Sequence, residues 1–221
     1  TQAIEVQKLN TQLLAIVNDV ENVSREMVYN SDVQEFMQDA AAGDPYPEDH
    51  STAYYINGFI SNRDYINSIV LTGMDHTLFS TELAYTNVSS FQNIQEKWWF
   101  PSLEETTDSY QWYPYALLDA KTFQSQENNE IPNQINTLML ARPVFSTADY
   151  QTQLGYLMIY LDDEYTQNLW RQISFGDTTN VFLMDTDNNI IISNVSMKDY
   201  SGILQEHLLP DESLPGSAIS Q

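Results

Sequence analysis

The sequence gathers bulky aromatic side chains in two neighbouring segments. The first is Trp98-Trp99-Phe100 and the second is Trp112-Tyr113-Pro114-Tyr115. Three of the four tryptophans of the chain fall between residues 98 and 112. Aromatic walls that carry a few polar groups are typical of small-molecule pockets. The sequence therefore offers five candidate ligand-binding residues, with a role in the hydrophobic core as the alternative: Trp99, Phe100, Trp112, Tyr113 and Tyr115.

Arg142 is a further candidate because it interrupts an apolar segment. Residues 138–145 are otherwise apolar, and Pro143 directly follows the arginine. A cation is costly to bury unless a charged or hydrogen-bonding partner meets it. Arg142 is therefore expected to face solvent, to meet an acidic side chain, or to bind an anionic ligand.

No group of residues shows a pattern typical of catalysis or metal binding. The chain has no cysteine, and its three histidines are widely separated. Asp185, Asp187 and Asn189 resemble the start of an EF-hand loop, but Ile190 replaces the required glycine. Neither a Gly-x-Ser-x-Gly elbow nor a glycine-rich phosphate loop occurs. We expect no enzyme activity, no cofactor and no metal.

The charge balance argues against nucleic acid as a partner. The chain has 31 acidic and 8 basic residues among 221, for a net charge of −23. Such a surface repels phosphate backbones, and the same repulsion disfavours binding to anionic lipids. No apolar segment is long enough to span a membrane, and the first residue is Thr1. We interpret the chain as part of a longer protein.

The first 42 residues are predicted to form a long helix. Neither glycine nor proline occurs before Gly43, and apolar residues are spaced alternately by three and four positions. This a/d stripe favours a helix that packs on its own domain or one that also pairs with a second subunit. Its members are Val6, Leu9, Leu13, Ile16, Val20, Val23 and Met27.

The pattern of the remaining chain indicates an α+β fold with an antiparallel sheet. A helix is expected over residues 51–63, followed by a hairpin of strands 66–72 and 77–81. A short helix or turn over 91–105 precedes three strands at 110–118, 137–145 and 154–161. Residues 162–174 are predicted to be helical, 181–184 and 190–193 to form a hairpin, and 198–209 a final helix. The last hairpin and helix are too small to stand alone.

The order of these elements resembles the double-Cache sensor domain, in which two PAS-like sheets are carried by one long N-terminal helix. The local sequence is similar to the extracellular region of YesM-type bacterial sensor histidine kinases. The similar segments are 63–71, 97–100, 138–144, 154–161 and 182–191. The resemblance implies a signalling helix at 1–42, a membrane-distal Cache domain at 43–162, and a connecting helix with an incomplete membrane-proximal module at 163–221.

The resemblance also implies a function. The chain would be the extracellular sensor of a membrane-anchored receptor, with flanking transmembrane helices and a kinase outside this sequence. It would bind a small extracellular molecule and form a homodimer through the N-terminal helix. Two alternatives are a chemoreceptor sensor, and a domain without a small ligand that recognises a partner protein.

Two more site residues follow from the resemblance alone. Amino-acid-binding Cache domains carry an Arg, one variable residue, and then Trp-Tyr. When Trp99 and Phe100 are placed on that pair, Lys97 stands where the arginine is expected. A lysine still attracts a carboxylate but lacks the two-pronged guanidinium. The family also places an acid near Asp149, although a simple turn residue is the alternative there.

Overall fold

The structure is a computed structural model of the whole chain. It describes residues 2–42, 50–74, 77–81, 99–106, 109–113, 138–171, 182–184 and 190–193, together with Gln95 and Lys97. The predicted helix at 198–209 and the strand segment 114–118 lie outside these described residues, as does Tyr115.

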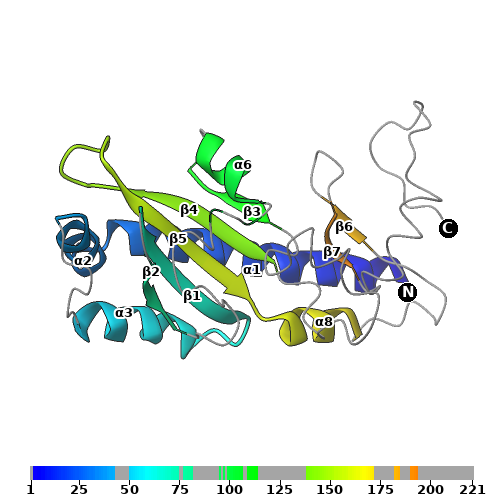
Figure 1. Cartoon of the computed structure of the whole chain (residues 1–221). Coiled ribbons are helices and arrows are strands. Elements are labelled where there is room, and N and C mark those ends of the chain that lie inside the picture. The colour runs from blue at the N-terminus through cyan, green and yellow to red at the C-terminus, as the bar shows by residue number, and fades with distance from the viewer. Residues whose placement is uncertain are drawn as a thin grey trace, which may run out of the picture.

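Helices and strands follow the order expected from the sequence (Figure 1). The helices are α1 (Gln2–Tyr29), α2 (Ser31–Ala41), α3 (His50–Ile60), α6 (Phe100–Glu105) and α8 (Asp163–Arg171). The strands are β1 (Ile66–Gly73), β2 (Thr77–Ser80), β3 (Gln111–Tyr113), β4 (Met139–Phe145), β5 (Gln153–Leu161), β6 (Phe182–Met184) and β7 (Ile190–Ser193).

The helical region of residues 1–42 is divided at Asn30, which the sequence analysis did not anticipate. Asn30 has an extended backbone, with ψ of 136°, and its side-chain oxygen accepts from the amides of Asp32 and Val33. These bonds satisfy amides at the start of α2 that have no partner within the helix. The asparagine therefore ends α1 and begins α2, although neither proline nor glycine is present.

The main sheet has five antiparallel strands in the order β2-β1-β5-β4-β3. The β1–β2 hairpin and the β3-β4-β5 meander are the units predicted from the sequence. They are joined by the pairing of β1 with β5, in which Val70 lies opposite Met158. A separate two-stranded sheet pairs β6 with β7, which confirms the second predicted hairpin.

Each face of the main sheet carries its own hydrophobic cluster because successive side chains of a strand point to opposite sides. The larger cluster lies on the face that α1, α2 and α3 cover, which we call the α1 face. It includes Leu71, Leu140 and Leu157. The smaller cluster lies on the opposite face, which α6 covers, and we call this the α6 face. Figure 1 shows α1 crossing behind the sheet over much of its length.

The heptad stripe of the N-terminal helix is buried within this chain. Six of its seven residues, from Leu9 to Met27, belong to the cluster of the α1 face, and only Val6 is exposed. The stripe thus packs on the chain's own domain. A second subunit would have to contact another side of α1.

Candidate functional site

Side chains from four strands line up in rows on the α6 face. Directly opposed residues of antiparallel strands point to the same side of the sheet. The register aligns Ser68 of β1 with Tyr160 of β5, Tyr160 with Met139 of β4, and Met139 with Tyr113 of β3. We call these four residues the hydroxyl row, since three of them carry a hydroxyl group.

The neighbouring rows on the α6 face are composed differently. One consists of Val70, Met158, Ala141 and Gln111, and the next contains Thr72, Tyr156 and Pro143. The face therefore combines apolar and aromatic surface with hydroxyl and amide groups. This is the mixture that small-molecule sites use to enclose and orient a ligand.

The start of α6 covers this face with aromatic rings. Trp99 is 1% exposed, and its ring centroid lies 5.6 Å from that of Tyr113. Phe100 meets Tyr156 edge to face, with 5.4 Å between centroids. Trp99, Phe100 and Tyr113 thus come together on the α6 face. They also belong to the hydrophobic cluster of this face, so the core interpretation of these residues holds as well.

The hydroxyl groups of the face are shielded from solvent. Ser68 is completely buried, and its Oγ has no hydrogen-bond partner. Burial raises the pKa of the Tyr160 phenol, so this group keeps its proton and remains a donor. Burial likewise raises the pKa of Tyr113, whose hydroxyl donates to Oε1 of Gln111. A buried polar group without a partner is rare in native proteins.

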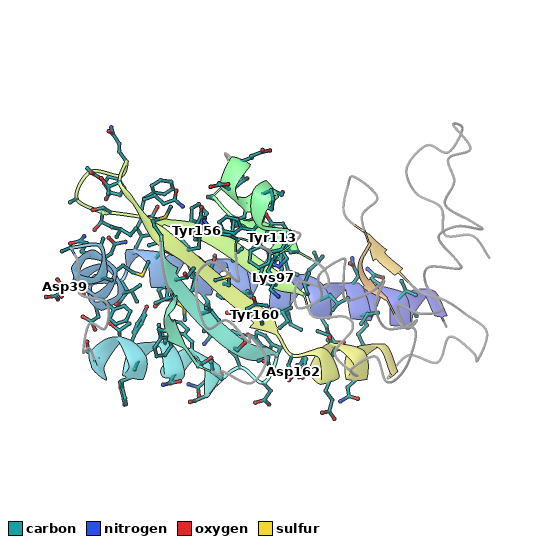
Figure 2. All side chains as sticks on the ribbon, in the orientation of Figure 1. Asp39, Lys97, Tyr113, Tyr156, Tyr160 and Asp162 are labelled. Atoms are coloured by element: carbon teal, nitrogen blue, oxygen red, sulfur yellow. The ribbon has the colours of Figure 1, made fainter. Side chains whose placement is uncertain are left out.

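Lys97 lies at the entry to α6. Its carbonyl oxygen accepts from the amide of Phe100 at 3.1 Å, and the residue is half-buried. In Figure 2 the labels of Tyr156, Tyr113, Lys97 and Tyr160 follow one another across the middle of the sheet. Within the described part of the chain, the only ion pair joins Arg63 to Asp19. The ammonium of Lys97 therefore has no carboxylate partner among those residues.

Arg142 lies on the other side of the sheet. It is 5% exposed, and the strand register places it beside Leu157 and Leu71 on the α1 face. Its Nε donates to Oγ of Ser24 in α1 at 3.1 Å, and its guanidinium lies 5.1 Å from the ring centroid of Tyr110. Its Nη2 has no hydrogen-bond partner. Arg142 and Lys97 are thus on opposite faces and do not converge.

Trp112 also contacts α1 rather than the α6 face. Its Nε1 donates to Oε1 of Glu21 at 3.1 Å. Burial and a hydrogen bond to the same carboxylate raise the pKa of Tyr110. Strand β3 therefore connects the two sides of the sheet, since Trp112 points to α1 and Tyr113 points to α6.

Arg142→Met is expected to stabilise the domain by about 1–3 kcal/mol. Burial lowers the pKa of Arg142, which reflects the cost of holding the charge there. Methionine fits the apolar surroundings, and Ser24 keeps a partner because its hydroxyl also donates to the Glu21 carbonyl at 2.8 Å. Urea unfolding measures the difference. Ser24→Ala should instead cost about 1 kcal/mol. A clear loss of stability in Arg142→Met would contradict this expectation.

Asp149 is occupied by its own turn. Its Oδ1 accepts from the amides of Gln151 at 2.9 Å and Thr152 at 3.0 Å, and its Oδ2 accepts from the Thr152 hydroxyl at 2.6 Å. The side chain is exposed in the connection between β4 and β5. The turn alternative of the sequence analysis thus describes its contacts, and its lone pairs face the loop rather than either sheet face.

The turn of Asp149 should loosen in acid. The Thr152 hydroxyl and the two amides lower the pKa of Asp149 to about 2. Because the pKa of Asp149 is lower in the folded protein than in the unfolded chain, where it is near 3.8, the ionised carboxylate stabilises the fold above about pH 4. This stabilisation is lost as the pH falls to about 2. Asp149→Asn mimics the protonated form. The wild type should melt higher than this variant at neutral pH, and the gap should close between pH 4 and 2. A constant gap would refute this explanation.

The sequence analysis missed Ser68, Tyr156 and Tyr160. They occupy alternate positions on β1 and β5, a period of two that places them on one face. That spacing was readable, but both strands are almost fully apolar around them, so the sequence did not indicate which face would carry the site. No cluster of metal-binding side chains occurs among the described residues, and no helix there is long and apolar enough to cross a membrane.

Comparison with known proteins shows a similarity of fold. No family model matches the sequence, and no curated protein matches it either. The sensor domain of the histidine kinase DctB from V. cholerae superposes with a TM-score of 0.53 at 12% identity. The match covers 97% of this chain and 78% of that domain. The chain thus has the α+β architecture of a receptor sensor domain.

Two chemoreceptor domains are less similar. The ligand-binding domain of the amino-acid chemoreceptor PctC of Pseudomonas aeruginosa, in complex with GABA, gives a TM-score of 0.49 at 12% identity, over 86% of this chain and 71% of that one. The ligand-binding domain of the chemoreceptor Tlp3 of Campylobacter jejuni, in complex with 4-methylisoleucine, gives a TM-score of 0.48 at 14% identity. This match covers 99% of this chain and 73% of that domain. Because both scores are below 0.5, neither similarity supports a conclusion about this chain.

Proposed function

We propose that this chain is the extracellular sensing domain of a bacterial membrane receptor and binds a small molecule on the α6 face. The observation that carries the proposal is the buried, partnerless hydroxyl of Ser68 in a row with Tyr160 and Tyr113. Trp99 and Phe100 pack on the same face against Tyr113 and Tyr156. A ligand group that bonded to this hydroxyl would remove an unsatisfied polar atom from the core. The sensor-domain fold supports the same function.

Polar contacts between the sheet and α1 offer a route for the signal. Asp19 of α1 accepts from Arg63 at 2.6 Å, Glu21 accepts from Trp112, and Ser24 accepts from Arg142. These contacts come from the segment before β1, from β3 and from β4, and they converge on less than two turns of the helix. A ligand that moves β3 on the α6 face would therefore alter the contact of Trp112 with α1. For signalling, the ligand must bind two arrangements of α1 unequally.

The domain limits and the parent protein belong to the same proposal. Residues 1–42 would form the signalling helix, 43–162 the membrane-distal Cache domain, and 163–221 a partial membrane-proximal module. The parent would be a dimeric sensor histidine kinase of the YesM type, with a chemoreceptor as the alternative. The flanking transmembrane helices and the kinase would lie outside this sequence.

A thermal-shift screen tests the proposed site. The purified domain is heated with amino acids, short peptides, sugars and organic acids. A compound at 100 times its dissociation constant should add about 2.7 kcal/mol of stability. Trp99→Leu should weaken its binding at least about tenfold, because the indole covers Tyr113. Gly58→Ala, in the exposed part of α3, is the matched control and should leave the affinity unchanged, because a Cβ at that position meets nothing within 4 Å.

Two results would count against this proposal. If a compound bound Trp99→Leu as well as wild type but lost affinity for Arg142→Met, the ligand would sit on the α1 side. If none of the four classes shifted a cooperatively melting sample, recognition of a partner protein would become the better explanation of the fold.

A further inference from the structure

We infer that the Glu21 carboxylate alternates between two partners, the Trp112 indole of β3 and the buried Arg142 guanidinium of β4, and that this exchange is a two-state switch between the sheet and α1. The switch is a property of the free domain, and only its use in signalling rests on the proposed sensing function. Three features point to it: an unmet need of Arg142, the replaceable partners of Glu21, and the spacing of residues along α1.

Arg142 is incompletely satisfied in the arrangement that the structure shows. Its Nε donates to Oγ of Ser24 at 3.1 Å, but its buried Nη2 has no hydrogen-bond partner. Burial and the charge of Arg25 lower the pKa of Arg142, whereas the charge of Glu21 raises it. Glu21 thus attracts the guanidinium, although no ion pair joins the two side chains in the described part of the chain. Because a buried donor without a partner is costly, Arg142 favours an arrangement in which a carboxylate reaches it.

The present partners of Glu21 can turn to water instead. Its Oε1 accepts from Nε1 of Trp112 at 3.1 Å, and the Tyr110 hydroxyl bonds to the same carboxylate. Both aromatic residues are only partly buried, so water can replace the carboxylate there. Water cannot replace it at Nη2 of Arg142, which is shielded from solvent. Moving the carboxylate therefore breaks bonds that solvent restores and makes one that solvent cannot.

The spacing of Glu21 and Ser24 makes the exchange sterically simple. The two residues lie three positions apart on α1, and their side chains meet the neighbouring strands β3 and β4. Three positions correspond to about 4.5 Å along the helix axis. Rotation of the Glu21 side chain with a small shift of α1 brings the carboxylate to Arg142, and shifts of about 1–2 Å are typical of helices that switch. The desolvation cost of a buried ion pair opposes its attraction, which keeps the two arrangements close in free energy.

The indole NMR signal of Trp112 reports the exchange. Isotope-labelled protein gives one indole N–H signal for each of its four tryptophans, and Trp112→Phe assigns the relevant one. Relaxation dispersion of this signal should detect exchange on the microsecond-to-millisecond timescale without any ligand. Ser24→Ala removes the present partner of Arg142 and should move the signal toward that of an indole bonded to water. Arg142→Met leaves Glu21 without its second partner, so the signal should move the opposite way along the same line and the exchange should disappear.

Glu21→Gln separates a change of charge from a change of packing. The glutamine keeps an oxygen that accepts from Trp112 but loses the charge that Arg142 attracts. The exchange should therefore disappear while the indole stays bonded. Lys8→Met is the matched control for Arg142→Met, because it removes an exposed cation from the same helix. This control should change neither the position nor the exchange of the Trp112 signal.

The outcomes separate the switch from the proposed function. The switch is wrong if wild type shows no exchange and Ser24→Ala leaves the Trp112 signal in place, or if exchange persists in both Arg142→Met and Glu21→Gln. If the exchange is found but no compound binds the domain, the sensing function fails and the switch stands. A compound that binds the α6 face should move the Trp112 signal along the same line. If it binds and leaves the signal in place, the switch does not carry the signal.

Discussion

Gly155→Ala should destabilise the domain by at least about 4 kcal/mol, enough to unfold a marginally stable protein. Gly155 lies in β5 with φ of +158°, and a Cβ atom there would stand 1.9 Å from the carbonyl oxygen of Thr72. It would also meet Met37 of α2 at 2.8 Å and Cα of Gly73 at 2.9 Å. Two of these three atoms belong to the backbone of β1, so rotation of a side chain cannot relieve the clash.

Urea unfolding, or the soluble yield if the variant does not fold, measures this effect. Gly58→Ala is the matched control, since a Cβ at Gly58 in the exposed part of α3 meets nothing within 4 Å. Alanine in a helix is favoured over glycine by about 0.5–1 kcal/mol, so the control should be slightly stabilised. If both variants had similar stability, the close packing of β5 on β1 would not be real.

Gln34→Leu should cost about 3 kcal/mol or more, because one buried side chain connects three segments. The amide of Gln34 donates to the carbonyl oxygens of Val28 at 2.6 Å and Phe145 at 3.0 Å. Its Oε1 accepts from the backbone amide of Thr147 at 2.9 Å. The leucine would leave these three backbone groups without this partner, at about 1–3 kcal/mol for each group that stays unsatisfied.

Gln38→Leu, one helical turn further along α2, is the comparison. Gln38 is exposed, and its two side-chain hydrogen bonds are both 3.5 Å long, so its loss should change stability by less than about 0.5 kcal/mol. Hydrogen exchange of the β4–β5 connection should rise in Gln34→Leu only. Equal exchange in the two variants would mean that Gln34 does not hold this connection.

Both variants bear on the proposed signalling. Gly155 allows α2 to approach the sheet, and Gln34 ties the last turn of α1 to the connection between β4 and β5. Through these contacts the end of α1 is fixed to the same strands that carry Arg142 and the hydroxyl row. A shift of β4 or β5 on ligand binding would therefore reach α1 at both its middle and its end.

The sequence by itself determined most of the local structure. The heptad stripe of α1, the β-branched run of β1 and the apolar strands β4 and β5 each have a period that selects one element type. The α+β class and the antiparallel meander followed from the order of these elements. The sequence analysis missed the break at Asn30. An asparagine side chain caps a helix only where its own backbone is extended, and the sequence alone does not show that conformation.

Only the tertiary structure decided how those elements form a site. The pairing of β1 with β5 joins residues more than 80 positions apart, and it alone aligns Ser68 with Tyr160. The same register sends Arg142 under α1, whereas Lys97 lies outside the strands at the entry to α6, although both are cations near apolar segments. A period of two tells which residues share a face, but it does not tell which face a helix will cover. That choice depends on contacts between distant segments, and it determines which polar groups are left to meet a ligand.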